Sequence, residues 1–288
     1  MAIFSWLLPV AILWQQSALV YQRMSNGAEI VAYVCPQVPY SVASLFVKTG
    51  SAFDPPNREG TAHLLEHLLP IQPHDGTTLQ IFIERQGALL VPETGRDFMA
   101  FHLKTLNQNF EQVLPFLSQL AGDLKVDLQV VEREKRLMWL ETLALYENSL
   151  WLMKTILESK LFDGTSYAHP PTGWLETIES LSLDDAIQFH KKHFFAPNMA
   201  FIAVVCEEKA LAALRQSAQR LPMVSKVSAE SASLSARDVL SQLEELLRRR
   251  LIRFRDAFWG IGWRIKFEPK ISHFAAETLW CRSWFPLS

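Results

Sequence analysis

Hydrophobic and polar positions follow two different periods along the chain, so strands and helices are both predicted. Runs rich in β-branched and small apolar side chains predict strands at residues 28–35, 41–48, 98–103 and 200–206. Apolar positions at helical spacing predict helices at residues 60–69, 79–86, 109–124, 127–161, 183–193 and 207–221. Because the two kinds of element are mixed without strict β–α–β alternation, the predicted fold class is α+β.

Local signals mark the ends of several predicted helices. Pro70 and Gly87 end the first two, and Pro115 is expected to kink the third. The fourth contains no glycine or proline and is therefore predicted as one long helical stretch. Ser182 and Asp185 form a capping box at the start of the fifth.

The beginning of the chain has a different character from the rest. Residues 3–14 (IFSWLLPVAILW) form a charge-free run of 12 residues. Such a run is too short to span a bilayer but suits the core of a signal peptide, although no lysine or arginine precedes it. We therefore expect residues 1–18 to be a signal-like or anchoring segment. This expectation favours export or membrane tethering over a buried first strand.

The end of the chain also differs from the main domain, which is predicted to span residues 19–222. Residues 223–236 are rich in serine and alanine and are predicted to be a linker. Residues 237–288 are predicted to contain a basic amphipathic helix followed by a tryptophan-rich strand. This segment is too small to form a domain alone, so it is expected to be a partial second unit.

Composition and charge exclude several classes of protein. The chain has 288 residues, of which 49% are hydrophobic and 20% charged, so it is globular rather than disordered. A net charge of −2 leaves no bulk positive field, which argues against a general nucleic-acid binder. The three cysteines are far apart and are predicted to be buried thiols, not a disulfide framework or a thiolate zinc site.

The informative segment for function is His63-Leu-Leu-Glu66-His67. On a helix, His63 and His67 lie one turn apart on the same face, as two ligands of one metal must. Imidazole nitrogen is a favoured zinc ligand, and zinc lowers the pKa of a bound water from 15.7 to about 7. Glu66 borders the same face and is therefore a candidate to accept the proton of that water.

A catalytic zinc site needs a third protein ligand, and the long predicted helix offers two candidates. Glu134 and Glu141 are seven residues apart and share one helix face. Either carboxylate could complete a His/His/Glu site, with the other as its supporting partner. His190 and His193 have no acidic or cysteine partner nearby in the sequence and are predicted to be exposed.

The sequence resembles the inverzincin metallopeptidases, the family of pitrilysin, insulinase and the mitochondrial processing peptidase β-subunit. The resemblance covers residues 19–221 and rests on ordered motifs: the inverted H-x-x-E-H, the later Glu-x6-Glu pair, 24-MSNG-27, 47-VKTGS-51, 166-SYAHPPTG-173, 181-LSLDD-185 and 195-FAPNM-199. It implies a mainly antiparallel sheet with packed helices. It also implies zinc ligands His63, His67 and Glu141, with Glu66 as general base and Glu134 as the supporting carboxylate.

The implied function is that of a zinc-dependent metalloendopeptidase acting on peptides or unfolded protein segments. Two departures from the family pattern favour the alternative of a non-catalytic subunit or a truncated fragment used for protein–protein interaction. Val91 and Pro92 stand where the family has Asn and Ala on the substrate-pairing strand, and a proline removes a backbone donor. The family also pairs this unit with a similar second half, so a second-half domain or subunit is expected as a partner.

Overall fold

The computed structural model describes residues 18–36 and 38–223. The predicted signal-like run, the predicted linker beyond Met223 and the partial second unit lie outside the described residues. No helix in the described part of the chain combines the length and apolar character needed to cross a membrane.

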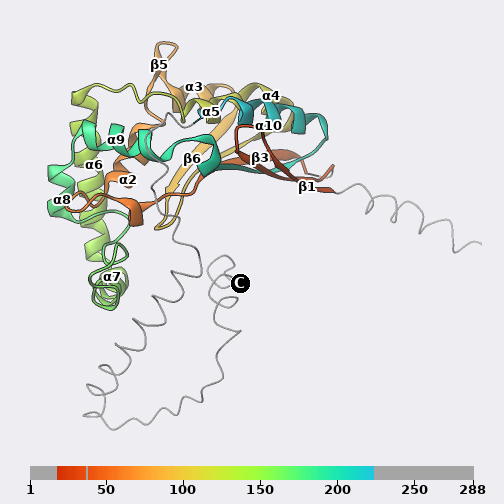
Figure 1. Cartoon of the computed structure of the whole chain (residues 1–288). Helices are drawn as coiled ribbons and strands as arrows, with labels where there is room; N and C mark the ends of the chain where they lie inside the picture. The colour runs from red at the N-terminus through yellow and green to blue at the C-terminus, as the bar shows by residue number, and fades with distance from the viewer. Residues whose placement is uncertain (1–17, 37, 224–288) are drawn as a thin grey trace, which may run out of the picture. The chain divides into compact units, whose positions relative to one another are not determined.

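A six-stranded sheet forms the centre of the described part (Figure 1). Its strands, in spatial order, are β1 (Ala18–Arg23), β2 (Glu29–Val34), β8 (Met199–Val205), β3 (Tyr40–Val47), β7 (Met99–Leu106) and β6 (Ala88–Thr94). Only the β2–β8 pair is parallel among these neighbours, and the other four pairs are antiparallel. A short hairpin, β4 (Pro73–His74) and β5 (Thr77–Thr78), stands apart from the sheet.

Nine α-helices are formed by the described residues. The longer ones are α2 (Thr61–Leu68), α6 (Leu128–Glu147), α7 (Ser149–Leu161), α9 (Leu183–His193) and α10 (Lys209–Gln219). The shorter ones are α3 (Leu79–Arg85), α4 (Phe110–Val113), α5 (Pro115–Gln119) and α8 (Leu175–Ser180), with 3₁₀ turns at Ser51–Phe53, Asn107–Asn109 and Ala196–Asn198. Together with the largely antiparallel sheet, they confirm the predicted α+β class.

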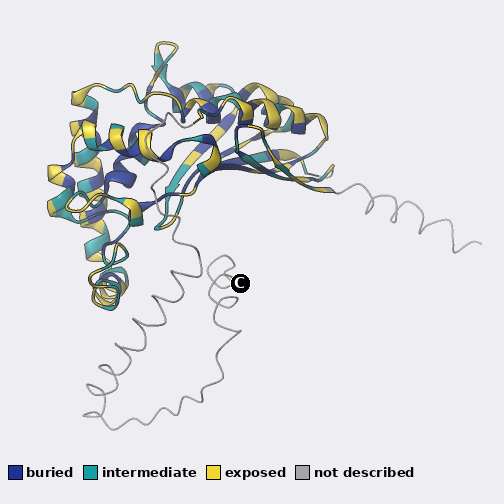
Figure 2. Ribbon diagram, in the orientation of Figure 1, coloured by how far each residue is buried: buried dark blue, intermediate teal, exposed yellow. Residues whose placement is uncertain are grey.

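The helices cover one face of the sheet and leave the other open. Helices α3, α4, α5 and α10 lie over one face, and α2, α6, α8 and α9 gather near β6 (Figure 1). Residues of alternate parity on each strand enter the main core, as the period of two in β strands requires. Side chains of the other parity, such as Tyr33, Val91 and Ile202, remain exposed on the open face. Figure 2 shows the ribbon coloured by burial, with buried residues concentrated along the sheet and at α2.

Helix α2 joins the two apolar cores of the described part. Ala62, Leu65 and Leu69 pack into the main core together with side chains of the sheet. Leu64 and Leu68 pack into a second core formed with α6, α8 and α9. Because both flanks of α2 are buried, its remaining face has a fixed direction, and that face carries the two histidines.

Several sequence predictions of element boundaries were wrong in detail. The stretch 127–161 is two helices, because the Asn148 side chain accepts hydrogen bonds from the amides of Leu150 and Trp151 and starts α7 afresh. The predicted helix at 109–124 is the short pair α4 and α5, with Pro115 as the first residue of the second. The β4–β5 hairpin and α8 were not predicted.

The thiol prediction also needs correction. Cys35 and Cys206 are half-buried instead of buried, because each lies at or just beyond the end of a strand. Cys281 lies outside the described residues.

Candidate metal centre

The start of α2 is held by a carboxylate from outside the helix. Gly60 stands at the N-cap with φ of 102°, a conformation that favours glycine, and has no side chain to cap the helix. Asp54 takes that role: its Oδ2 accepts from the Gly60 amide at 2.7 Å and its Oδ1 from the Ala62 amide at 2.8 Å. Burial raises the pKa of Asp54, and the two amide hydrogen bonds oppose this rise. The first turn, which carries His63, is therefore tied to the preceding loop.

A second loop packs closely against the same helix start. A Cβ at Gly173 would clash with the carbonyl group of Glu59, so only glycine fits this approach. The Thr177 hydroxyl donates to the same Glu59 carbonyl at 2.7 Å. These contacts hold the 169–173 loop, part of one of the motif segments, against the start of α2.

His63, His67 and Glu141 lie together, with one potential ligand atom from each within 4.8 Å of the others. The two imidazole Nε2 atoms are 3.2 Å apart, and Glu141 Oε2 lies 3.8 Å from that of His63 and 3.6 Å from that of His67. Ligands about 2.1 Å from a tetrahedral zinc ion are separated by roughly 3.4 Å from one another. The donor types and spacings therefore fit a zinc ion with a fourth, open position.

Glu134 supports His67 from the opposite side of the ring. Its Oε2 lies 3.3 Å from His67 Nδ1, while Arg133 donates to its Oε1 from Nε at 3.0 Å. When Nδ1 carries the proton and donates to Glu134, Nε2 keeps its lone pair for a metal. Of the two carboxylates that the sequence left open, the structure brings Glu141 beside both Nε2 atoms and Glu134 beside Nδ1.

The pKa values of the two histidines are shifted in opposite directions. Burial and, to a smaller extent, the charge of the neighbouring His67 together lower the pKa of His63 to about 4. Burial also lowers the pKa of His67, but Glu141 and Glu134 outweigh burial and leave it above the ordinary 6.5. The contact with His67 lowers the pKa of Glu141, so that carboxyl is ionised at neutral pH. The metal-free site thus holds one neutral imidazole, one readily protonated imidazole and one anion.

Glu66 occupies the side of α2 that faces β6. Burial raises the pKa of its carboxyl, with Glu141 and Glu93 acting in the same direction and Thr94 and His67 against it. A carboxylate whose pKa is raised toward neutral pH is a better proton acceptor and donor in turn. Glu66 lies on α2 beside the face that carries His63 and His67, and it is not itself one of the candidate ligands. This position suits a residue that exchanges protons.

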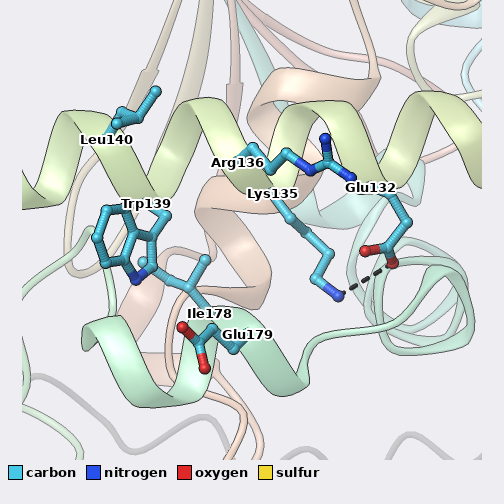
Figure 3. A pocket seen from close by; sticks show the side chains of 7 residues that line it. All are labelled: Glu132, Lys135, Arg136, Trp139, Leu140, Ile178 and Glu179. Atoms are coloured by element: carbon cyan, nitrogen blue, oxygen red, sulfur yellow. Dashed lines mark hydrogen bonds and ion pairs between the residues drawn. The ribbon is translucent and has the colours of Figure 1, made fainter.

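The hollows that the structure forms on α6 lie on its far side from this site. The larger has a volume of about 380 Å³ and lies between α6 and α8, lined by Glu132, Lys135, Arg136, Trp139, Leu140, Ile178 and Glu179 (Figure 3). Lys135 is already engaged by Glu132 at 3.1 Å across its wall. None of the candidate ligands lines this hollow, so it is separate from the metal centre.

The structure corrects the sequence predictions for two histidines and reveals a role for Asp54 that was not predicted. His190 and His193 were predicted to be exposed but are 4% and 5% exposed, because α9 packs against α2 and the two rings meet the Leu120 carbonyl and the Phe53 ring. Burial lowers the pKa of both. Neither lies with the candidate ligands. Asp54 was missed because a capping side chain six residues before the N-cap residue Gly60 leaves no local capping signal.

The sequence of this chain is similar to those of several known proteins. The model of the family described as Insulinase (Peptidase family M16) matches residues 30–170. The mitochondrial-processing peptidase subunit beta of Neurospora crassa is 25% identical over 224 residues, covering 72% of this chain and 44% of that protein. An uncharacterized zinc protease of Rickettsia bellii is 25% identical over 178 residues, covering 61% and 43%. Subunit 1 of the bovine (Bos taurus) mitochondrial cytochrome b-c1 complex is 23% identical over 186 residues, covering 63% and 38%. The chain therefore spans less than half the length of these relatives.

Solved structures share the fold. A protease from Helicobacter pylori superposes with a TM-score of 0.67 at 18% identity, covering 75% of this chain and 53% of that one. The peptidase M16 inactive domain from Pseudomonas fluorescens superposes with a TM-score of 0.65 at 22% identity, covering 72% and 51%. At these identities the likeness speaks for the architecture, and that architecture occurs in a domain described as inactive as well as in a protease.

Proposed function

Residues 30–170 belong to the insulinase family, peptidase family M16, as the sequence motifs predicted, and from this we propose that the chain is a zinc-dependent metalloendopeptidase. Its substrates would be short peptides or unfolded segments of proteins. The observation that carries the proposal is the meeting of His63, His67 and Glu141 at tetrahedral spacing. Two imidazoles and a carboxylate with an open fourth position are a donor set of catalytic zinc sites.

The residues around the site divide the chemistry between them. His63, His67 and Glu141 would hold the metal, which when bound supplies a Lewis acid and a water of lowered pKa. Glu66 would accept a proton from the attacking water and deliver it to the leaving amine, and its raised pKa suits both transfers. Glu134 would fix the ring of His67 through Nδ1 and keep Nε2 aimed at the metal.

The test separates metal binding from turnover. We expect purified protein to contain one zinc ion per chain and to cleave unfolded peptides in a reaction that a chelator stops. Glu66→Gln should abolish cleavage and retain zinc, because Glu66 is not a ligand. His63→Ala and His67→Ala should lose zinc, whereas His74→Ala, away from the site, should keep it. Zinc content that does not fall in either ligand variant would contradict the proposed site.

A second candidate function is that of a non-catalytic subunit that keeps the fold for interaction. Two observations favour it: Pro92 offers no amide hydrogen on edge strand β6, and a structural neighbour is described as an inactive domain. The same assay distinguishes the two. Zinc-loaded protein that cleaves no peptide, alone or with a candidate second-half protein encoded nearby, would support the non-catalytic function.

A further inference from the structure

A row of polar side chains crosses the open face of the sheet beside the candidate site. The Ser44 hydroxyl lies 2.8 Å from His102 Nδ1, and His102 Nε2 lies 3.1 Å from Glu93 Oε2. The three residues come from the neighbouring strands β3, β7 and β6, and Ser44 is directly opposite His102 in the register. One tautomer satisfies the whole row: Ser44 donates to Nδ1, and Nε2–H donates to Glu93. The carboxylate is therefore held in a fixed place.

Glu93 lies on strand β6, one residue before Thr94, which is near the candidate general base Glu66. Successive side chains of a strand point to opposite faces, so Thr94 points toward α2 and Glu66 while Glu93 points to the open face. A group bound at Glu93 would therefore lie one strand position from Thr94, on the opposite face of β6 from Glu66.

No basic side chain of the described residues balances this carboxylate other than the His102 ring. Glu93 is 41% exposed, and no described side chain bonds its Oε1. Lys104, next along the same face of β7, instead places its ammonium 4.4 Å from the ring centre of Tyr40. Arg96 is occupied by Glu158 at 2.7 Å and by the Tyr167 carbonyl at 2.8 Å. The Glu93 carboxylate therefore has no lysine or arginine partner among the described residues, and a ligand could supply that positive charge.

Strand β6 ends the sheet, so its outer edge is open to an added strand, although Pro92 within it donates no backbone hydrogen bond. A peptide residue paired opposite Glu93 would place its Cβ about 5 Å from that of Glu93 on the same face. This is within reach of a lysine or arginine side chain. On the same face, Val91 and Leu89 are exposed two and four residues earlier along the strand. They offer apolar contacts to alternate residues of the same peptide.

We propose that the Ser44–His102–Glu93 row is a specificity subsite that selects peptides with a lysine or arginine beside the scissile bond. The apolar side chains of Val91 and Leu89 extend this preference to apolar residues two and four positions away. The inference rests on the proposed peptidase function. Glu93 is the residue that contacts the substrate, and His102 is a positioning residue that acts through Glu93.

Peptide binding tests the subsite separately from cleavage. Three matched fluorescent strand-forming peptides carry lysine, glutamine or glutamate at one position between alternating valines. Their affinities are measured by anisotropy with the zinc-loaded full chain carrying Glu66→Gln, so that no peptide is consumed. We expect the lysine peptide to bind about fivefold more tightly than the glutamine peptide, as for a partly exposed ion pair, and the glutamate peptide to bind weakest.

Variants at the row assign the effect to its members. Adding Glu93→Gln should remove the lysine preference, and Glu93→Lys should reverse it in favour of the glutamate peptide. His102→Leu should lose the preference while His102→Gln, which can still donate to Glu93, should keep most of it; a purely structural role would not move this ratio. Glu29→Gln is the control, because Glu29 lies on the same open face four strands away.

Two outcomes would overturn the subsite. One is equal affinity for the lysine and glutamate peptides, including absence of binding to all three. The other is a lysine preference that survives Glu93→Gln. Failure of the peptidase function is a different result: the lysine preference in binding would remain, while the chain without the Glu66 substitution would cleave none of the peptides.

Discussion

His67 contacts all three of the other polar groups that form the candidate metal centre. Its Nε2 faces His63 and Glu141, and its Nδ1 faces Glu134. Burial alone would keep this ring neutral, but the two carboxylates favour the protonated form. A metal ion at the site must therefore displace a proton from His67, whereas His63 is already neutral.

Zinc affinity should depend on pH through His67. Since its pKa lies above 6.5 in the metal-free protein, its imidazole gains a proton as the pH falls, and that proton competes with zinc. We expect the affinity to fall by about tenfold per pH unit below that pKa. Zinc titrations in a competing chelator between about pH 8 and pH 6 measure this. An affinity that stays constant over this range would show that His67 binds zinc without losing a proton.

Glu134→Gln tests the support that this carboxylate gives to His67. Loss of a hydrogen-bond partner of a metal-bound histidine costs about 10- to 100-fold in metal affinity, and we expect a loss of that size. Glu132→Gln is the matched control, because Glu132 lies on the same helix but faces away from the site, with its side chain 60% exposed. Equal zinc affinities in the two variants would exclude the supporting role.

At the scale of elements, α2 owes its position to contacts on three sides. Its leucines enter two separate cores, and Asp54 holds its first turn. Helix α6 crosses it closely enough to bring Glu134 to His67, although the two residues are 67 positions apart. Positioning of the ligands within a few tenths of an ångström depends on these contacts, because α2 itself is only 8 residues long.

Asp54→Ala should destabilise the protein and loosen the metal centre together. Removing a capping carboxylate leaves two helix amides without their partner and costs about 1–2 kcal/mol of unfolding free energy. Urea unfolding of the metal-free protein measures this loss, and zinc titration measures the accompanying fall in affinity. Asp123→Ala, at an exposed aspartate outside the helices, should change neither. Unchanged stability in Asp54→Ala would mean that the cap does not support α2.

At the scale of the whole molecule, one face of the sheet remains open in the described part of the chain. It exposes apolar side chains on several strands, with Tyr21 at 64%, Leu106 at 54% and Ile202 at 42% exposure. Large exposed apolar surfaces mark interaction sites or association. The matched relatives, of which this chain spans less than half, include proteins named as subunits.

We predict that the chain needs a second half, from a partner or another copy, for full peptidase activity. An isolated domain with its sheet face open does not exclude water or clamp a peptide. Light scattering at several concentrations, with and without residues 223–288, measures association, and cleavage is assayed in the same samples. A stable monomer that stays fully active after deletion of residues 223–288 would contradict this prediction.

The sequence by itself determined the features that depend on short separations. The spacing of His63 and His67, the seven-residue spacing of Glu134 and Glu141, and the capping box at Ser182 all follow from the period of one helix. The fold class and the family also followed from patterns and motifs along the chain. These signals are local, because hydrogen bonding within a turn fixes which side chains share a face.

Only the tertiary structure decided which distant groups meet. The approach of Glu141 to both Nε2 atoms depends on how α6 packs against α2, and the Glu93–His102–Ser44 row depends on strand order and register. The burial of His193 likewise depends on what covers α9. Such contacts join residues far apart in sequence, and their energy comes from packing apolar faces whose pairing no local pattern specifies.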